Sequence, residues 1–139
     1  IAWSSIVGRV QTYPTVRQFE WRVKEDGTMA LTTYPGCTST GQVEVTTTGK
    51  VAVAQWTHLA VTVDAGQNAV FYLDGVANGT GKLASAGICT MPAQTSIGGT
   101  NYVLGLGPDP EYVWDGRIDD VRIYDRVLSE NEVATLAGQ

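Results

Sequence analysis

The stretch Gln55–Val76 constrains the fold of this chain more than any other, because it has the pattern of two strands joined into a hairpin. Apolar and polar side chains alternate over residues 58–64, the period of a strand that is buried on one face. Residues 69–73 carry apolar side chains on both faces, which is typical of a central strand. Asp74-Gly75 then predicts a tight turn, since glycine adopts a positive φ without steric cost. We therefore expect this hairpin to form the middle of an all-β domain.

Other segments of the chain alternate in the same way and are separated by turns rich in glycine and proline. Asp26-Gly27 predicts a second hairpin turn between strands near residues 19–24 and 29–34. The other predicted strands lie in residues 1–10, 41–48, 77–93, 95–99 and 116–124. Strands of this number and pattern predict a two-sheet antiparallel sandwich.

One short helix is predicted at the C-terminal end of the chain. Ser129 is the expected N-cap, Glu132 completes a capping box, and Leu128 is placed to pack on Val133. The apolar stripe that follows covers only about two turns, so the helix must dock on a sheet to be stable.

Length and charge exclude several classes of protein. A chain of 139 residues fits a single domain over residues 1–139. With 9 Lys+Arg against 14 Asp+Glu, its net charge of -5 disfavours nucleic acid and anionic membranes as partners. No apolar run approaches the ~20 residues of a membrane span. The chain starts at Ile1 without a signal-peptide pattern, so we expect a processed or excised piece.

The two cysteines, Cys37 and Cys89, both lie in turn-rich stretches. They can form a disulfide if their Cα atoms come within ~7 Å, and such a bond would favour an extracellular protein. Alternatively, they are two unrelated small residues. Their spacing excludes a CxxC motif, and a single histidine, His58, argues against a zinc site.

Several of these segments resemble a laminin-G-like domain of the concanavalin A-like jelly-roll superfamily. The family pattern contains, in order, a strand with the motif Trp-x-His, a turn with the motif Tyr-x-Asp-Gly and a strand with the motif Ile-Gly-Gly. A final strand then leads to a helix that begins with the motif Ser-x-x-Glu. The matching positions are Trp56, His58, Tyr72, Asp74, Gly75, Ile97, Gly98, Gly116, Asp119, Arg122, Tyr124, Leu128, Ser129 and Glu132. The resemblance implies an all-β, two-sheet antiparallel jelly-roll sandwich with one short C-terminal helix. It says little about the ligand.

One departure from the family pattern concerns the N-terminal end. Family members usually begin with one or two extra strands before the segment that corresponds to Trp3–Arg9, and those strands pair near the C-terminus. Here this segment lies almost at the start of the chain. We expect a minimal fold, a loss of the N-terminal strands, or a partner chain on the uncovered sheet edge, which would allow a homodimer.

The sequence offers no acid pair for catalysis. Glycosidases of this superfamily place two carboxylates on one strand, facing a cleft. Glu25 and Asp26 lie in a predicted turn, and Asp119 and Asp120 are expected on opposite faces of their strand. No Ser-His-Asp arrangement surrounds His58. We therefore expect no enzyme, and a fragment of a glycoside hydrolase is the least favoured alternative.

Asp119 shares its predicted strand face with Val121 and Ile123, so we expect it to be partly buried. A buried carboxylate needs hydrogen bonds, an arginine or a metal. The simpler interpretation is that it holds a neighbouring loop. The resemblance to calcium-binding relatives implies the other: Asp115, Asp119 and backbone carbonyls as Ca²⁺ ligands, since Ca²⁺ takes six to eight oxygen atoms. No other cofactor is expected.

A long loop over residues 101–114 carries aromatic and polar side chains and is the candidate ligand site. Aromatic rings that stack on sugar faces, helped by polar neighbours, would form a carbohydrate platform. The candidate ligand residues are Asn101, Tyr102, Asp109, Tyr112 and Trp114. Trp114 is also the structural aromatic of the family pattern and can instead fill the core. Trp56 is expected to be structural.

These patterns together predict a non-catalytic recognition module, extracellular or on a cell surface, that binds carbohydrate or a glycosylated surface. The alternative is a protein–protein interaction or structural spacer module without a small ligand.

Overall fold

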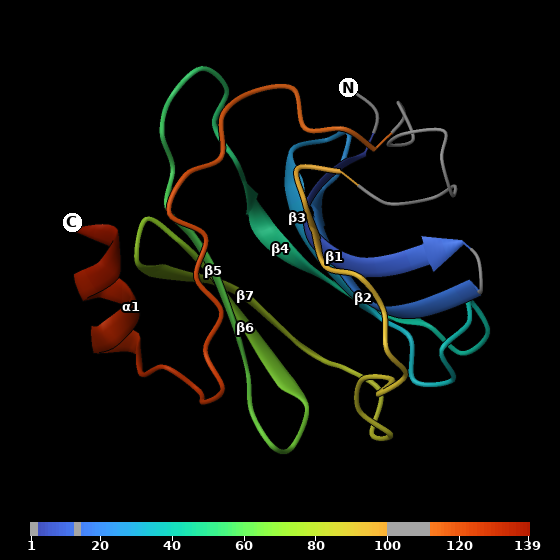
Figure 1. The fold of residues 1–139 in the computed structure, drawn as a ribbon. Coiled ribbons are helices and arrows are strands. Elements are labelled where there is room, and N and C mark those ends of the chain that lie inside the picture. The colour runs from blue at the N-terminus through green and yellow to red at the C-terminus, as the bar shows by residue number, and fades with distance from the viewer. Residues whose placement is uncertain (1–2, 13–14, 100–111) are drawn as a thin grey trace.

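Two antiparallel sheets and one helix form the fold in the computed structural model, which describes residues 3–12, 15–99 and 112–139 (Figure 1). The larger sheet has the strand order β4-β3-β2-β1-β8, and the smaller sheet has the order β5-β6-β7. The elements are β1 (Ser4–Thr12), β2 (Thr15–Val23), β3 (Thr28–Thr33), β4 (Val43–Lys50), β5 (Leu59–Val63), β6 (Asn68–Leu73), β7 (Val76–Lys82), β8 (Ser96–Ile97) and α1 (Glu130–Ala137). The predicted two-sheet sandwich with a C-terminal helix is confirmed.

The hairpin that was expected at the centre of the domain forms β5 and β6, and β7 follows the Asp-Gly turn. Asp74 and Gly75 have φ values of 48° and 79°, the positive values that a tight two-residue turn requires. β6 is the central strand of its sheet, and Phe71 and Tyr72, on its two faces, are both buried. The prediction of a central strand is therefore confirmed.

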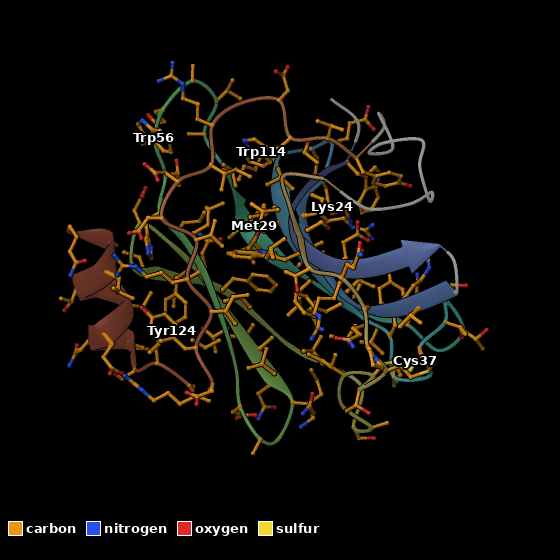
Figure 2. The ribbon with its side chains drawn as sticks, in the orientation of Figure 1. Lys24, Met29, Cys37, Trp56, Trp114 and Tyr124 are labelled. Carbon is orange, nitrogen blue, oxygen red and sulfur yellow. A yellow bond between two sulfur atoms is a disulfide. The ribbon has the colours of Figure 1, made fainter. Side chains whose placement is uncertain are left out.

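The hydrophobic core lies between the two sheets. Met29 and Leu31 of β3 face Phe71 and Ala69 of β6, and Leu83 closes the same cluster. Figure 2 shows Met29 in the layer between the sheets. One face of each sheet thus packs in the core.

β4 and β7, the outer strands of the two sheets, approach each other closely. A Cβ atom on Gly81 of β7 would lie 2.4 Å from Val45 Cγ1, so only glycine fits at this position. Asn78 Oδ1 accepts a hydrogen bond from the Gly49 N–H at 2.6 Å. A side-chain amide therefore joins the two sheets where no backbone ladder connects them.

α1 begins with the predicted capping box. Ser129 N donates to Glu132 Oε2 at 2.8 Å, and Glu132 N donates to Ser129 Oγ at 3.3 Å. Hydrogen bonds from the Arg126 guanidinium and from Ser129 lower the pKa of Glu132 to about 2. The helix docks on the β6–β7 turn, where a Cβ on Gly75 would lie 2.9 Å from Ala134 Cα.

The strand predicted over residues 116–124 is wrong, because this segment forms no ladder with any described strand. Figure 1 draws it as a coil that leads to α1. Side-chain alternation defines two faces, but a strand also needs a neighbour to accept its backbone hydrogen bonds. Asp119 is exposed, so its predicted partial burial is wrong as well. Ile123, which was expected on the same face, is 72% exposed.

Cys37 and Cys89 form the disulfide that the sequence allowed, with a Cα–Cα distance of 5.1 Å. The bond ties the loop between β3 and β4 to the segment that follows β7. Trp56, expected as a structural aromatic, has 66% of its surface exposed and does not pack into the core. In the part of the chain that the structure describes, no helix has the length and apolar character needed to cross a membrane.

Candidate functional site

The face of the large sheet that points away from the core carries a group of charged side chains. Alternation along β2 sends its apolar side chains into the core, so the intervening polar ones share the opposite face. The register of β2, β3 and β4 then sets Glu20 opposite Thr32, and Thr32 opposite Glu44. We call Glu20, Arg22, Lys24, Thr32 and Glu44 the polar cluster.

Arg22 is the centre of the polar cluster. Its Nη1 atom lies 3.1 Å from Glu20 Oε2, and its Nη2 atom lies 2.9 Å from Glu44 Oε2. The same Nη2 donates to Thr32 Oγ1 at 3.2 Å. Lys24 Nζ pairs with the second oxygen of Glu44 at 3.2 Å. One guanidinium therefore bridges carboxylates from two strands, which fixes all five side chains in one network.

The two carboxylates of the cluster lie in different environments. Glu20 is fully buried, and burial raises its pKa even though Arg22 and Arg17 act in the opposite direction. Glu44 keeps 27% of its side chain exposed. Burial also acts to raise the pKa of Glu44, but hydrogen bonds from Arg22 and Lys24 outweigh it and leave that pKa below its ordinary value. Glu44 and Lys24 thus form the open, charged edge of the cluster.

Two aromatic rings border the cluster. The Arg22 guanidinium lies 4.1 Å from the centre of a Trp3 ring, and Lys24 Nζ lies 5.2 Å from it, both within the range of cation–π attraction. The Tyr34 hydroxyl lies 3.5 Å from Glu20 Oε2. The cluster therefore combines fixed charges, hydroxyl groups and aromatic surface.

Three buried polar atoms at the base of the cluster have no hydrogen-bond partner among the described residues: Ser5 Oγ, Glu20 Oε1 and Arg22 Nε. Ser5 is the register partner of Arg22 across β1 and β2, which places the two on one face. Buried polar groups are nearly always satisfied in folded proteins. These atoms thus represent hydrogen-bonding capacity that the described chain leaves unused.

The described end of the predicted loop site lies beside this cluster. The Ser5 N–H donates to the Tyr112 carbonyl at 3.1 Å, and the Trp114 N–H donates to the Gly98 carbonyl at 3.0 Å. Tyr112 and Trp114 are half-buried. Trp114 Nε1 is buried without a described partner, 2.9 Å from where a Cβ on Gly116 would lie. Asn101, Tyr102 and Asp109, the other candidates in this loop, lie outside the described residues.

The candidate calcium ligands, Asp115 and Asp119, are both exposed. Asp119 Oδ1 accepts a hydrogen bond from the N–H of Asp120 at 2.8 Å. Within residues 3–12, 15–99 and 112–139, no group of three or more His, Cys, Asp or Glu side chains is arranged to hold a metal ion. The calcium site therefore stays a prediction.

A second surface feature is an open hollow of about 310 Å³ beside α1. Tyr124 and Leu136 line it together with Arg126 and Glu132. The two charged residues pair with each other at 2.6 Å, so the hollow offers less unused hydrogen-bonding capacity than the polar cluster.

Sequence reasoning missed Glu20, Arg22 and Glu44, because their alternation with apolar residues is typical of a solvated face. Counting back from a two-residue Asp26-Gly27 turn would pair Glu20 with Thr33, whereas the structure pairs Glu20 with Thr32. No local signal indicated that this second face of the sheet is covered.

Comparisons with known proteins bear on the fold. A laminin G family model, described as the concanavalin A-like lectin/glucanases superfamily, matches residues 2–134. No curated protein sequence matches the chain.

The solved structures that are similar include the following two. The native heptameric SAP-like pentraxin from Limulus polyphemus has a TM-score of 0.67 and 20% identity, with 98% of this chain and 63% of that chain covered. An S-layer domain-containing protein from Clostridium thermocellum (residues 221–444) has a TM-score of 0.47 and 26% identity, covering 86% of this chain and 55% of that one. The chain thus spans less than two thirds of either structure. Since the family model covers nearly the whole sequence, the chain belongs to the laminin G-like family of the concanavalin A-like lectin/glucanases superfamily.

Proposed function

We propose that this chain is a non-catalytic recognition module that binds carbohydrate or a glycosylated surface through the polar cluster. The observation that carries the proposal is the Arg22 bridge between Glu20 and Glu44 beside the ring of Trp3. Sugar hydroxyls both donate and accept hydrogen bonds, so a fixed set of charged donors and acceptors suits them. An aromatic ring adds an apolar surface for the face of a sugar ring.

The position of the predicted loop supports the same site. Tyr112 is hydrogen-bonded through its carbonyl to Ser5, whose register partner is Arg22. A ligand on the polar cluster would therefore lie near the described end of the loop. We propose Tyr112 and Trp114, with Asn101, Tyr102 and Asp109, as further contacts to the ligand.

The state of the two carboxylates supports a non-catalytic role. Glu20 has no exposed surface, and Glu44 is held by both Arg22 and Lys24. A general acid or base must be within hydrogen-bonding reach of its substrate. The disulfide between Cys37 and Cys89 supports an extracellular or cell-surface location, since such bonds persist in oxidising compartments.

The test is a glycan array probed with the wild-type chain and with Glu44→Gln, which changes the open edge of the cluster. The matched control is Glu130→Gln, an exposed carboxylate on α1. We expect at least one carbohydrate to bind the wild type and the control, and to bind Glu44→Gln differently. Equal binding by all three would show that the cluster is not the site.

Calcium is tested on the same array. If Asp115 and Asp119 bind Ca²⁺ that the ligand requires, EDTA and Asp119→Asn should each abolish carbohydrate binding. Binding that is unchanged by both treatments would contradict a role for calcium in recognition.

A second candidate function is protein–protein interaction at a sheet edge. β5 is an edge strand of the small sheet, with no partner on its outer side among the described strands. Val121 and Ile123 are exposed in the coil that leads to α1. Unpaired edges and apolar patches of this kind favour the addition of a strand from another chain, including a second copy. Sedimentation over a wide concentration range tests this: we expect a dimer that Ile123→Glu weakens, whereas a monomer at all concentrations would contradict self-association.

A further inference from the structure

We infer that the polar cluster selects a neutral, hydroxyl-rich ligand and rejects sugars that carry carboxylate or sulfate groups. This inference rests on the proposed function and names the chemical class of the ligand. It follows from how the cations of the cluster are paired, from the groups at its open edge and from the charge of the whole chain.

Both cations of the cluster are already engaged. Arg22 lies within 3.1 Å of Glu20 and within 2.9 Å of Glu44, and Lys24 lies within 3.2 Å of Glu44. Sites that bind anions present arginine or lysine side chains with hydrogen-bonding groups free for the ligand. An anionic ligand here would have to displace Glu44 from both cations, and it would then lie beside a second carboxyl group.

The open edge of the cluster also favours hydroxyl groups. A carboxylate has about four acceptor sites and an ammonium group three donors, so Glu44 and Lys24 keep hydrogen-bonding capacity beyond their bonds within the cluster. A hydroxyl group can donate to Glu44 and accept from Lys24. A carboxylate or sulfate group can only accept hydrogen bonds, and the Glu44 carboxylate would repel it.

The charge of the chain acts in the same direction. A net charge of -5 slows the approach of polyanions and gives no electrostatic attraction toward acidic glycans. Binding of a neutral ligand should therefore depend little on ionic strength, whereas binding of an acidic glycan through Arg22 and Lys24 would weaken as salt screens that local attraction.

The experiment measures binding of the full chain to neoglycoproteins that carry neutral oligosaccharides of glucose, mannose or galactose, and to sulfated and sialylated counterparts. Each is measured at roughly 0.05 M and 0.5 M salt, where the screening length falls about threefold. We expect a neutral oligosaccharide to bind, with an affinity that changes less than about twofold between the two salt concentrations.

Glu44→Gln gives the sharper readout, because it releases Lys24 and one arm of Arg22 from their carboxylate. We expect this variant to gain salt-sensitive binding to the sulfated or sialylated probes. Glu130→Gln, which removes the same charge from α1, should gain none. Circular dichroism checks that both variants are folded.

The outcomes separate the two proposals. A wild-type preference for acidic probes would overturn the inference and leave carbohydrate recognition standing. If Glu44→Gln gained no binding to the acidic probes, the argument that pairing with Glu44 keeps the cations from anionic ligands would be overturned. No binding of any probe by the wild type would overturn both this inference and the proposed function.

Discussion

Replacing Arg22 with methionine would leave the buried Glu20 carboxyl without the guanidinium 3.1 Å away. Methionine keeps an unbranched apolar side chain that ends near the position of Arg Nε, so the main change is the loss of the guanidinium charge and its hydrogen bonds. Breaking a buried ion pair by removing one partner typically costs 3–5 kcal/mol.

The carboxyl group can limit this cost by taking up a proton. Protonating a group of ordinary pKa 4.5 at pH 7 costs about 3.4 kcal/mol, at 1.36 kcal/mol per pH unit. The wild-type carboxyl already bears part of this cost, because its folded-state pKa is raised. We therefore expect Arg22→Met to lower the free energy of unfolding by at most about 3 kcal/mol at pH 7. Near pH 4 the carboxyl is protonated in both states, and the loss should fall to about 1 kcal/mol.

The sign of this pH dependence follows from the direction of the pKa shift. The folded-state pKa of Glu20 is already raised above its ordinary value. Stability from such a group is fully present below the unfolded-state pKa and is lost as the pH rises through the folded-state value. Arg22→Met raises the folded-state pKa of Glu20 further, so the stability of the variant continues to fall up to a higher pH than that of the wild type.

Urea unfolding at pH 4 and pH 7 provides the assay. In a chain that already carries Glu20→Gln, the titrating group is absent. The free energy of unfolding that Arg22→Met removes from this chain should therefore be the same at pH 4 and pH 7. Lys24→Met, which removes a half-exposed partner of Glu44, should cost at most about 1 kcal/mol. An Arg22→Met loss of equal size at both pH values would refute the reasoning, because Glu20 would then not be the charge that Arg22 stabilises.

Three further predictions concern the scaffold. Gly81→Ala should cost about 1–3 kcal/mol in urea unfolding, because its Cβ would lie 2.4 Å from a neighbouring side chain; Gly36→Ala, with its nearest neighbour at 3.8 Å, is the control, and equal losses would contradict the packing argument. The Cys37–Cys89 bond closes a separation of 52 residues, so its reduction should lower the free energy of unfolding by about 4 kcal/mol in the chain-entropy model. The melting temperature should therefore fall when reductant is added, and an unchanged melting temperature would contradict a stabilising role for the bond. NMR titration of Glu132 should give a midpoint of about 2, so the stability it adds is present above its ordinary pKa and lost as the pH falls toward 2; a midpoint near 4.5 would rule this out.

The features that the sequence predicted well are those fixed by neighbouring residues. The turn at Asp74-Gly75 depends on a local need for positive φ, and the helix start at Ser129 depends on a residue three positions later. The sandwich follows because such turns join strands that each have an apolar face. Local chemistry was sufficient for these elements.

The predictions that failed depend on residues far away in the chain. Residues 116–124 have the alternation of a strand, but no described strand lies in register with them. Asp119 was expected to be partly buried only because that strand was expected to pack. The polar cluster was not predicted, because alternation with apolar residues is typical of a solvated face, whereas Glu20 is buried. Trp3 and the segment at Tyr112 come to this face from both ends of the chain.

The amide of Asn78 has a consequence for the choice of expression host. Asn78, Gly79 and Thr80 form an acceptor pattern for N-glycosylation. In the fold, however, Asn78 Nδ2 lies 2.6 Å from where a Cβ on Gly49 would be, and its oxygen is bonded to the Gly49 N–H. A sugar on this nitrogen would crowd β4 and disturb the bond to Gly49, so we expect glycosylation to weaken the contact between the two sheets. A eukaryotic secretory host should therefore divide the product into folded, unmodified chains and modified chains that fail quality control, and Thr80→Ala should recover the lost fraction.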